Sequence, residues 1–251
     1  MTIQNKWPKI FPPLTAEQQR ISDDFMAHWH VVLPSRYSII DEFNHRYPVQ
    51  HAPANFDRTL EIGAGLGEHL KYEVLTPEQR KNYFCLDVRE NMVEVIHQAF
   101  PDVRAIVHDC QEPLTMFEDG YFDRALAVHV LEHLPNLPAA IREIYRLIDK
   151  QKGVFSVVIP CEGGLAYGLA RRISAQRIFE KRYNQSYKWF ISREHINLAA
   201  EILEELKPYF EIKNRTLFPF PFIPIQTLNL VIGLTLTPRP IPIMPVDQKG
   251  I

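Results

Sequence analysis

The order of apolar and polar positions in the middle of the chain alternates between two patterns. Five short apolar runs predict strands, at residues 58–62, 83–88, 103–107, 122–130 and 154–159. Between them, apolar side chains three and four positions apart predict helices, at residues 66–75, 91–100 and 138–150. Strands that alternate with helices are typical of a parallel, doubly wound sheet, so we expect an α/β fold.

Both flanks add elements to this alternation. A further helix is predicted at 194–206 and two more strands at 210–218 and 228–236, which makes the expected sheet seven-stranded and mostly parallel. Apolar and aromatic positions in 15–47 predict N-terminal helices. The expected organisation is an N-terminal helical addition (1–53), a main domain (54–237) with a cap after the fifth strand (about 161–193), and an irregular C-terminal tail (238–251).

Proline is unevenly distributed along the chain. Of 20 prolines, six lie in residues 1–53, eight in 208–251, and six in the 154 residues between. Because proline lacks a backbone N–H and interrupts helices and sheets, regular structure is expected in the middle. We therefore interpret the two flanks as additions to a common core.

Composition and charge narrow the class of protein. Hydrophobic residues at 46% and charged residues at 23% are typical of a globular domain, and a net charge of −2 argues against a nucleic-acid coat protein. Three cysteines without a C-x-x-C pair predict neither a disulfide framework nor a zinc site. The start lacks the pattern of a signal peptide, and prolines interrupt the apolar region 217–236, so a cytoplasmic protein without a membrane-spanning helix is expected.

The most informative motif lies directly after the first predicted strand. Residues 60–68 read Leu-Glu-Ile-Gly-Ala-Gly-Leu-Gly-Glu, with Gly63, Gly65 and Gly67 at alternate positions. Glycines in such a turn let a ligand approach the backbone closely, next to the free N–H groups of a helix N-terminus. Dinucleotide-binding turns have the pattern G-x-G-x-x-G, whereas here the third glycine comes one residue early, which argues against a nicotinamide enzyme.

Together with the acidic Glu61, this turn resembles motif I of class I S-adenosylmethionine (SAM)-dependent methyltransferases. Three later features fall at the expected strand ends: Asp87, the run His108-Asp109-Cys110, and residues 122–134 with their end V-L-E-H-L. That last run is common in the small-molecule branch that includes ubiquinone-biosynthesis methyltransferases. The resemblance covers about residues 57–160 and implies a Rossmann-like methyltransferase fold, whose ligands bind outside the carboxyl ends of the strands.

The resemblance implies SAM as the cofactor and a methyltransferase of the EC 2.1.1 type, with oxygen or nitrogen of a small-molecule acceptor as the target. It places part of the cofactor site at the first two strands and part at the third and fourth. The implied cofactor-binding residues are Glu61, Gly63, Ala64, Gly65 and Gly67 around the methionine part, Asp87 and Val88 at the ribose, Met92, Asp109 and Cys110 at the adenine, and His129 near the methyl group.

Two histidines in this motif are the catalytic candidates, since histidine titrates near neutrality and can remove a proton from an acceptor hydroxyl. These are His129 and His133, although in the family this region often only shapes the cofactor floor. The run His129-x-x-Glu132-His133 also resembles the metal-binding E-x-x-E-H of small-RNA 2′-O-methyltransferases. Magnesium prefers oxygen ligands and no second histidine pair is evident, so no metal is expected. In the alternative interpretation, Glu132 and His133 orient the loop after the fourth strand.

The predicted cap is locally basic. Its seven cations between residues 168 and 193 are Arg171, Arg172, Arg177, Lys181, Arg182, Lys188 and Arg193. They form a solvated face, or they recognise an anionic acceptor or an acidic membrane surface. The interleaved aromatic residues either stack on a ligand or form the core of the cap; they are Tyr167, Tyr183, Tyr187, Trp189 and Phe190.

Two functional alternatives remain open at this point. The basic cap favours an RNA methyltransferase as one of them, although nucleic acid is not the expected partner. The other is a non-catalytic subunit with a SAM-binding fold. The N-terminal helices are expected to pack over the mouth of the cofactor site, with Arg36 or Tyr37 closing it, or to serve packing alone.

Overall fold

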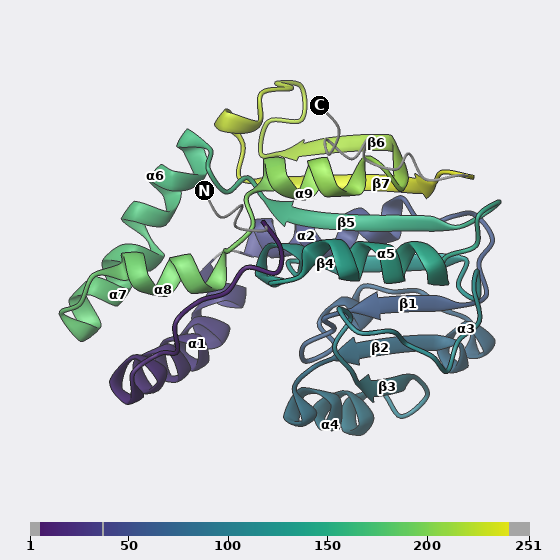
Figure 1. Ribbon diagram of the computed structural model, residues 1–251, viewed down its shortest axis with the longest axis horizontal. Coiled ribbons are helices and arrows are strands. Elements are labelled where there is room, and N and C mark those ends of the chain that lie inside the picture. The colour runs from purple at the N-terminus through teal and green to yellow at the C-terminus, as the bar shows by residue number, and fades with distance from the viewer. Residues whose placement is uncertain (1–5, 37, 241–251) are drawn as a thin grey trace, which may run out of the picture.

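In the computed structural model, which describes residues 6–36 and 38–240, seven strands of the described chain form one sheet (Figure 1). Their order is β3-β2-β1-β4-β5-β7-β6. Neighbouring strands from β3 to β5 are parallel, while β7 runs antiparallel to both β5 and β6. The strands are β1 (Thr59–Ile62), β2 (Tyr83–Asp87), β3 (Arg104–Val107), β4 (Arg124–Val128), β5 (Val154–Pro160), β6 (Phe210–Phe218) and β7 (Val231–Pro238). The predicted seven-stranded, mostly parallel sheet is confirmed.

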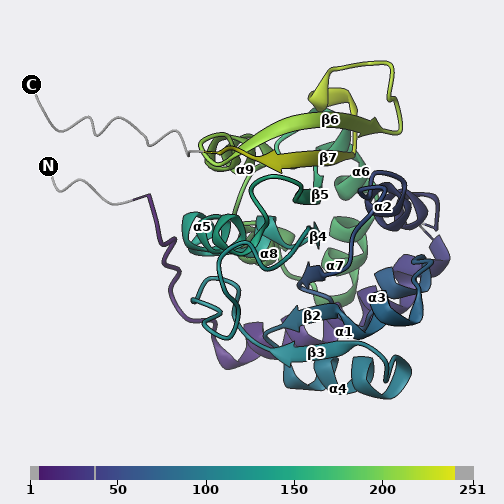
Figure 2. The same ribbon diagram turned by 90° about the vertical axis from the view of Figure 1, so that its right-hand side faces the viewer.

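The helices cover both faces of the sheet (Figure 2). Along the chain they are α1 (Ala16–Arg36), α2 (Ser38–Gln50), η1 (His69–Lys71), α3 (Pro77–Lys81), α4 (Glu90–Ala99), η2 (Leu131–His133), α5 (Leu137–Leu147), α6 (Leu165–Ile173), α7 (Ala175–Tyr183), α8 (Tyr187–Glu194), α9 (Ala199–Leu206) and η3 (Gln226–Leu228). Helices α5 and α9 bury apolar residues in the large core on one face of the sheet. Helix α4 buries Ile96 in a smaller core on the other face. Strands β1, β2 and β4 are buried along most of their length, as strands covered on both faces should be.

The prediction of a helix at residues 66–75 is wrong. The structure forms only the single 3₁₀ turn η1 there, and Val74, which was expected on the buried helix face, is 92% exposed. Gly67 has a φ of +76°, a left-handed conformation that a right-handed helix does not contain. A short helix, α3, instead begins after Thr76, whose side chain accepts a hydrogen bond from the Gln79 amide in a capping box.

Two other helices differ from their predictions in detail. Helix α4 buries Val93 and Ile96, whereas Val95, which was expected on the same face as Ile96, is 38% exposed. Helix α9 begins at Ala199 rather than at residue 194. The residues before it are held in an extended connection, because the Asn197 side chain donates hydrogen bonds to two carbonyl groups around η2, those of Leu131 and Leu134.

The two N-terminal helices pack in different places. Helix α1 packs against the cap, where the Phe25 ring meets the rings of Phe179 and Phe190 edge to face, each with centroids 5.1 Å apart. Helix α2 lies on the sheet, with Tyr47 against Gly233 of β7. The first half of α2 also reaches the segment after the glycine turn, where Asp41 accepts a hydrogen bond from the Tyr72 hydroxyl, so the expected position over the cofactor mouth stays a prediction. Tyr37 and the side chain of Arg36 lie outside the described residues.

The cap consists of α6, α7 and α8 and lies beyond the carboxyl ends of the parallel strands (Figure 1). Its aromatic residues Phe179, Tyr187 and Phe190 are buried together with α1, so most of them form the core of the cap. Leu165, Leu169 and Ile173 of α6 are instead 61–75% exposed. Within the described ranges, no helix has the length and apolar character required to cross a membrane. The C-terminal tail predicted for residues 238–251 begins with the last residue of β7, Pro238. Residues 241–251 of this tail lie outside the described residues.

Candidate functional site

Four of the segments singled out in the sequence meet at one edge of the sheet. The glycine turn follows β1, Asp87 ends β2, Asp109 follows β3 and His129 follows β4. Because these strands are parallel, their carboxyl ends lie at the same edge. This is the edge that faces the cap (Figure 1). It is also the place where ligands bind in open α/β sheets.

The glycine turn has a backbone that other residue types rarely adopt. Gly63, Gly65 and Gly67 have φ values of +65°, +56° and +76°. A Cβ on Gly63 would lie 2.4 Å from the side chain of Val130, which belongs to the loop after β4. A Cβ on Gly67 would lie 3.0 Å from the Phe100 ring. Gly63 and Gly67 are therefore required for close packing between the turn and its neighbours.

Gly65 differs from the other two glycines, because the space next to its Cα is open. A Cβ there would meet only the carboxylate of Glu68, at 3.7 Å. Its backbone N–H donates a hydrogen bond to Oδ2 of Asp87 at 3.0 Å. The turn is thus joined to the end of β2, and it leaves room beside Gly65 that a ligand can occupy.

Asp87 is a charged group held in a defined position. Its carboxylate is almost fully buried and forms an ion pair with Arg89, whose Nε lies 2.9 Å from Oδ1. Burial by itself would raise the pKa of Asp87, but the hydrogen bonds from Arg89 and Gly65 outweigh it and lower the pKa below its usual range. Asp87 is therefore ionised at neutral pH, as an acceptor for hydroxyl groups should be.

The residues at this edge fit the cofactor that the resemblance implies. Gly65 leaves open space, Asp87 presents an ionised carboxylate, and Val88 beside it is 59% exposed, which suits an apolar adenosyl ring system. Met92 is half-buried at the start of α4. Asp109 is already held by the backbone and side chain of Gln111, and Cys110 is buried in the main core.

Glu61 lies away from this edge, inside the sheet. Its carboxylate is 3% exposed and accepts a hydrogen bond from the Tyr83 hydroxyl at 2.8 Å. Burial is the main cause that raises its pKa to about 8. That Glu61 holds the methionine part of the cofactor stays a prediction. The buried position of its side chain indicates that Glu61 contributes to the hydrogen bonding inside the protein.

This raised pKa predicts a pH-dependent stability. Between pH 4.5 and 8, unfolding releases the Glu61 proton, so wild-type stability should fall as the pH rises. Glu61→Gln removes this effect and keeps an acceptor for Tyr83. We expect it to stabilise the protein by about 3 kcal/mol at pH 7 relative to wild type, with little change at pH 4.5.

Urea unfolding at several pH values measures this difference. Glu94→Gln, at an exposed position of α4, is the matched control and should follow the wild-type curve. A Glu61→Gln curve parallel to that of wild type would contradict the assignment of the buried proton to Glu61.

The loop after β4 gathers the predicted catalytic histidines around one carboxylate. His129 has a φ of +53°, which is uncommon for a residue with a side chain, and its Nδ1 lies 3.0 Å from Oε1 of Glu132. Glu132 is completely buried. Burial would raise its pKa, but the hydrogen bond from His129 and the neighbouring histidines lower it to about 2, so the carboxylate is ionised.

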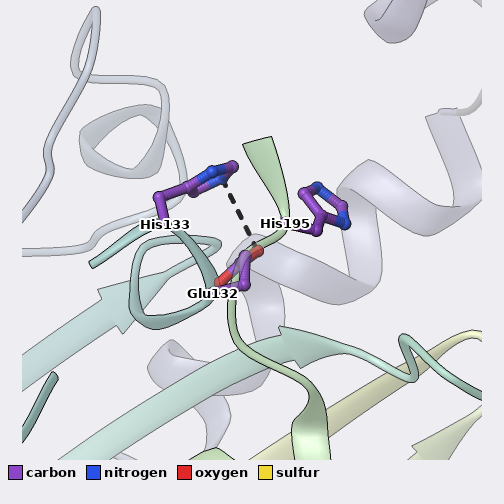
Figure 3. Close-up of side chains that lie close together, drawn as sticks. All are labelled: Glu132, His133 and His195. Atoms are coloured by element: carbon purple, nitrogen blue, oxygen red, sulfur yellow. Dashed lines mark ion pairs between the residues drawn. The ribbon is translucent and has the colours of Figure 1, made fainter. Parts of the chain in front are cut away.

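A third histidine, His195, completes this group and was missed in the sequence. It lies in the connection between α8 and α9, where a helix was predicted. Figure 3 shows the rings of His133 and His195 on either side of Glu132. The polar run Arg193-Glu194-His195 before Asn197 is the only local signal, and its contact with Glu132 depends on the fold.

The basic residues of the cap separate into two groups. Arg171 pairs with Glu162, and Arg182 pairs with Asp24 of α1. Arg193 donates to the carbonyl of Pro12. The remaining cations are exposed and have no ion-pair partner among residues 6–36 and 38–240; they are Arg172, Arg177, Lys181 and Lys188. Part of the positive charge thus joins the cap to its surroundings, and part forms a solvated face.

The comparisons with known proteins agree with this geometry. Residues 60–157 match the methyltransferase domain family, and no curated protein matches the chain. Three similar solved structures cover most of this chain.

A TehB-like SAM-dependent methyltransferase from Corynebacterium glutamicum has 15% identity and a TM-score of 0.58, over 88% of this chain and 100% of the other. The PH0226 protein from Pyrococcus horikoshii has 14% identity and a TM-score of 0.59, over 85% and 99%. The 1,6-didemethyltoxoflavin-N1-methyltransferase of Burkholderia thailandensis, which binds S-adenosylhomocysteine in its structure, has 18% identity and a TM-score of 0.54, over 92% and 94%. At these identities the likeness shows the fold.

Proposed function

We propose that this chain, whose residues 60–157 form a methyltransferase domain of the class I SAM-dependent type, transfers a methyl group from SAM to oxygen or nitrogen of a small-molecule acceptor. The observation that carries the proposal is the hydrogen bond between the Gly65 amide and the Asp87 carboxylate. It joins the open part of the glycine turn to an ionised acceptor group at the carboxyl edge of the sheet. An adenosyl cofactor needs both features side by side.

When bound, SAM supplies a methyl group activated by its sulfonium, and the transfer is an in-line displacement that depends on alignment. In this proposal, the glycine turn provides the space for the cofactor, and Asp87 accepts hydrogen bonds from its ribose. Arg89 now holds both oxygens of Asp87, with contacts of 2.9 and 3.1 Å. Ribose hydroxyl groups compete for the same oxygens, so Arg89 gives up at least one of these contacts on binding.

His129 is the proposed proton acceptor for an acceptor hydroxyl or amine. Its Nδ1 faces the ionised Glu132, so the Nδ1–H form is favoured and the lone pair lies on Nε2. His133 has a different partner, since its Nδ1 faces the backbone carbonyl of Glu194. This contact attaches the loop to the end of α8, so the proposed task of His133 includes orienting the loop.

The acceptor is proposed to be a small, anionic molecule. The exposed cations of the cap, such as Arg172 and Arg177, supply positive charge beyond the carboxyl edge. The small substrate named for the Burkholderia structure supports this choice by analogy of fold. An acidic membrane surface that the cap contacts, with Leu165 and Leu169 exposed, is the second partner that these features favour.

Incubation of the protein with methyl-labelled SAM and fractions of cell extract tests this function. We expect label in the small-molecule fraction. Label in RNA instead, together with RNA binding that falls steeply with salt, would favour an RNA methyltransferase. Binding of SAM without transfer to any fraction would favour a non-catalytic subunit.

A further inference from the structure

The cluster of Glu132, His133 and His195 has a feature that the proposed methyl transfer does not use. Each of the three side chains offers one metal-ligating atom, and these atoms lie within 4.8 Å of one another (Figure 3). Glu132 and His133 belong to η2, and His195 lies in the connection between α8 and α9. The two histidines are 62 residues apart in the sequence. The fold therefore supplies the second histidine that the sequence motif lacked.

A second observation concerns the free oxygen of Glu132. The side chain is 0% exposed, and its Oε2 has no hydrogen-bond partner among the described residues, while Oε1 faces His129. An unpartnered carboxylate oxygen in a protein interior costs free energy unless a cation or a donor meets it. Oε1 also lies 3.9 Å from Nε2 of His133, so the carboxylate faces the cluster through this oxygen, and the buried group as a whole is short of partners.

Both histidines present their Nε2 atoms with a lone pair. Nδ1 of His133 lies 2.5 Å from the carbonyl oxygen of Glu194, which can only accept, so this nitrogen carries the proton. Nδ1 of His195 lies 3.0 Å from the carboxylate of Glu162 and donates to it. Metal-binding histidines are typically held in this way, with the second nitrogen donating to a carbonyl or a carboxylate.

The backbone fixes the three ligands relative to one another. The amides of Ile196 and Asn197 donate to the carbonyl of Glu132, at 2.9 and 3.0 Å. The Asn197 side chain adds hydrogen bonds to the carbonyls of Leu131 and Leu134, each at 2.8 Å. The segment that carries His195 is therefore attached to the turn that carries Glu132 and His133, before any ion binds.

We infer that Glu132, His133 and His195 form a binding site for a divalent transition-metal ion of the zinc type. Two imidazole nitrogens and a carboxylate are the protein ligands of many catalytic zinc sites, which keep a further position open. Ligand atoms around one zinc ion lie about 3.3 Å apart. The ligand atoms of these three side chains lie within 4.8 Å of one another, so each pair has to approach by about 1.5 Å at most to bind one ion. The His133 side chain is 38% exposed, which leaves the site open on one side.

This inference replaces the sequence-based expectation of no metal. That expectation considered magnesium, which prefers oxygen ligands, whereas imidazole suits zinc and its neighbours. If the proposed function holds, the ion would bind an oxygen or nitrogen of the acceptor beside His129 and lower the pKa of that group.

Titration of the chelator-treated, full-length protein with Co²⁺, followed by visible absorption, and with Zn²⁺ by calorimetry tests the site. Neither measurement requires SAM. We expect one equivalent to bind to wild type, and His195→Gln to weaken binding at least about tenfold. The control His97→Gln changes an exposed histidine of α4 and should bind as wild type does.

Glu132→Gln is the second variant, with circular dichroism as the check of folding, because Glu132 is fully buried. His195 is partly exposed, so its variant keeps the test valid if Glu132→Gln does not fold. Absence of metal binding in wild type, or binding by His195→Gln equal to that of wild type, would overturn the inference. Metal binding without binding of S-adenosylhomocysteine would support the site and overturn the proposed function.

Discussion

Gly65→Arg is expected to weaken the binding of S-adenosylhomocysteine at least about 100-fold, a loss of about 2.7 kcal/mol or more. Gly65 leaves open space beside the turn, and a Cβ there meets no atom closer than 3.7 Å. An arginine side chain would fill the room that the cofactor needs and would place a second cation near Asp87. Isothermal titration calorimetry with S-adenosylhomocysteine measures the change.

The chain offers a matched control for this substitution. Gly120 has a φ of +71°, close to the +56° of Gly65, and its added Cβ also meets nothing within 3.7 Å. It lies before β4, at the opposite edge of the sheet. Both substitutions carry a similar backbone strain of about 1–3 kcal/mol. Gly120→Arg should therefore lose stability but bind as wild type does, and equal loss of binding in both variants would refute the position of the site.

Arg124→Met is expected to destabilise the protein by about 3–5 kcal/mol. Arg124 is 0% exposed, and its guanidinium lies 2.6 Å from a carboxylate oxygen of Glu73, which is also buried. Burial would raise the pKa of Glu73, but His69 and Arg124 together lower it to about 2, so the carboxylate is charged at neutral pH. Removing Arg124 leaves this charge buried without its cation. Urea unfolding measures the loss.

Two further variants separate the charge effect from the loss of packing. Arg124→Met combined with Glu73→Gln should recover a large part of the stability, because the uncompensated charge is gone. Arg20→Met, which breaks an exposed pair with Glu17, should leave the unfolding curve unchanged. If the double variant is as unstable as the single one, packing rather than charge explains the role of Arg124.

The arrangement of the sheet was predictable because it depends on local patterns. Buried parallel strands are short apolar runs, and β4 and β5 are recognisable from their residues alone. The same holds for the glycine turn, since Gly63 and Gly65 stand at a strand end where only glycine suits the backbone. A parallel sheet then brings the strand ends to one edge, so the position of Asp87 followed from the topology.

The parts that could not be predicted depend on contacts between distant segments. Apolar spacing at Leu66 and Leu70 indicates a helix, but the left-handed backbone of Gly67 and its contact with Phe100 prevent one. His195 reaches Glu132 only because Asn197 attaches its segment to η2. No spacing rule along the chain contains such a contact.

The packing of α2 has a consequence for how the chain folds. The Tyr47 ring covers Gly233 of β7, and its hydroxyl bonds to Thr235, which is 188 positions later in the sequence. During synthesis, α2 leaves the ribosome early, and the ring lacks its contacts with β7 until that strand follows. Contacts of such long range slow folding and leave apolar surface exposed in the meantime. A nascent chain that stops before β7 should therefore be a substrate for chaperones, although all of residues 60–157, which match the methyltransferase domain family, have already been made.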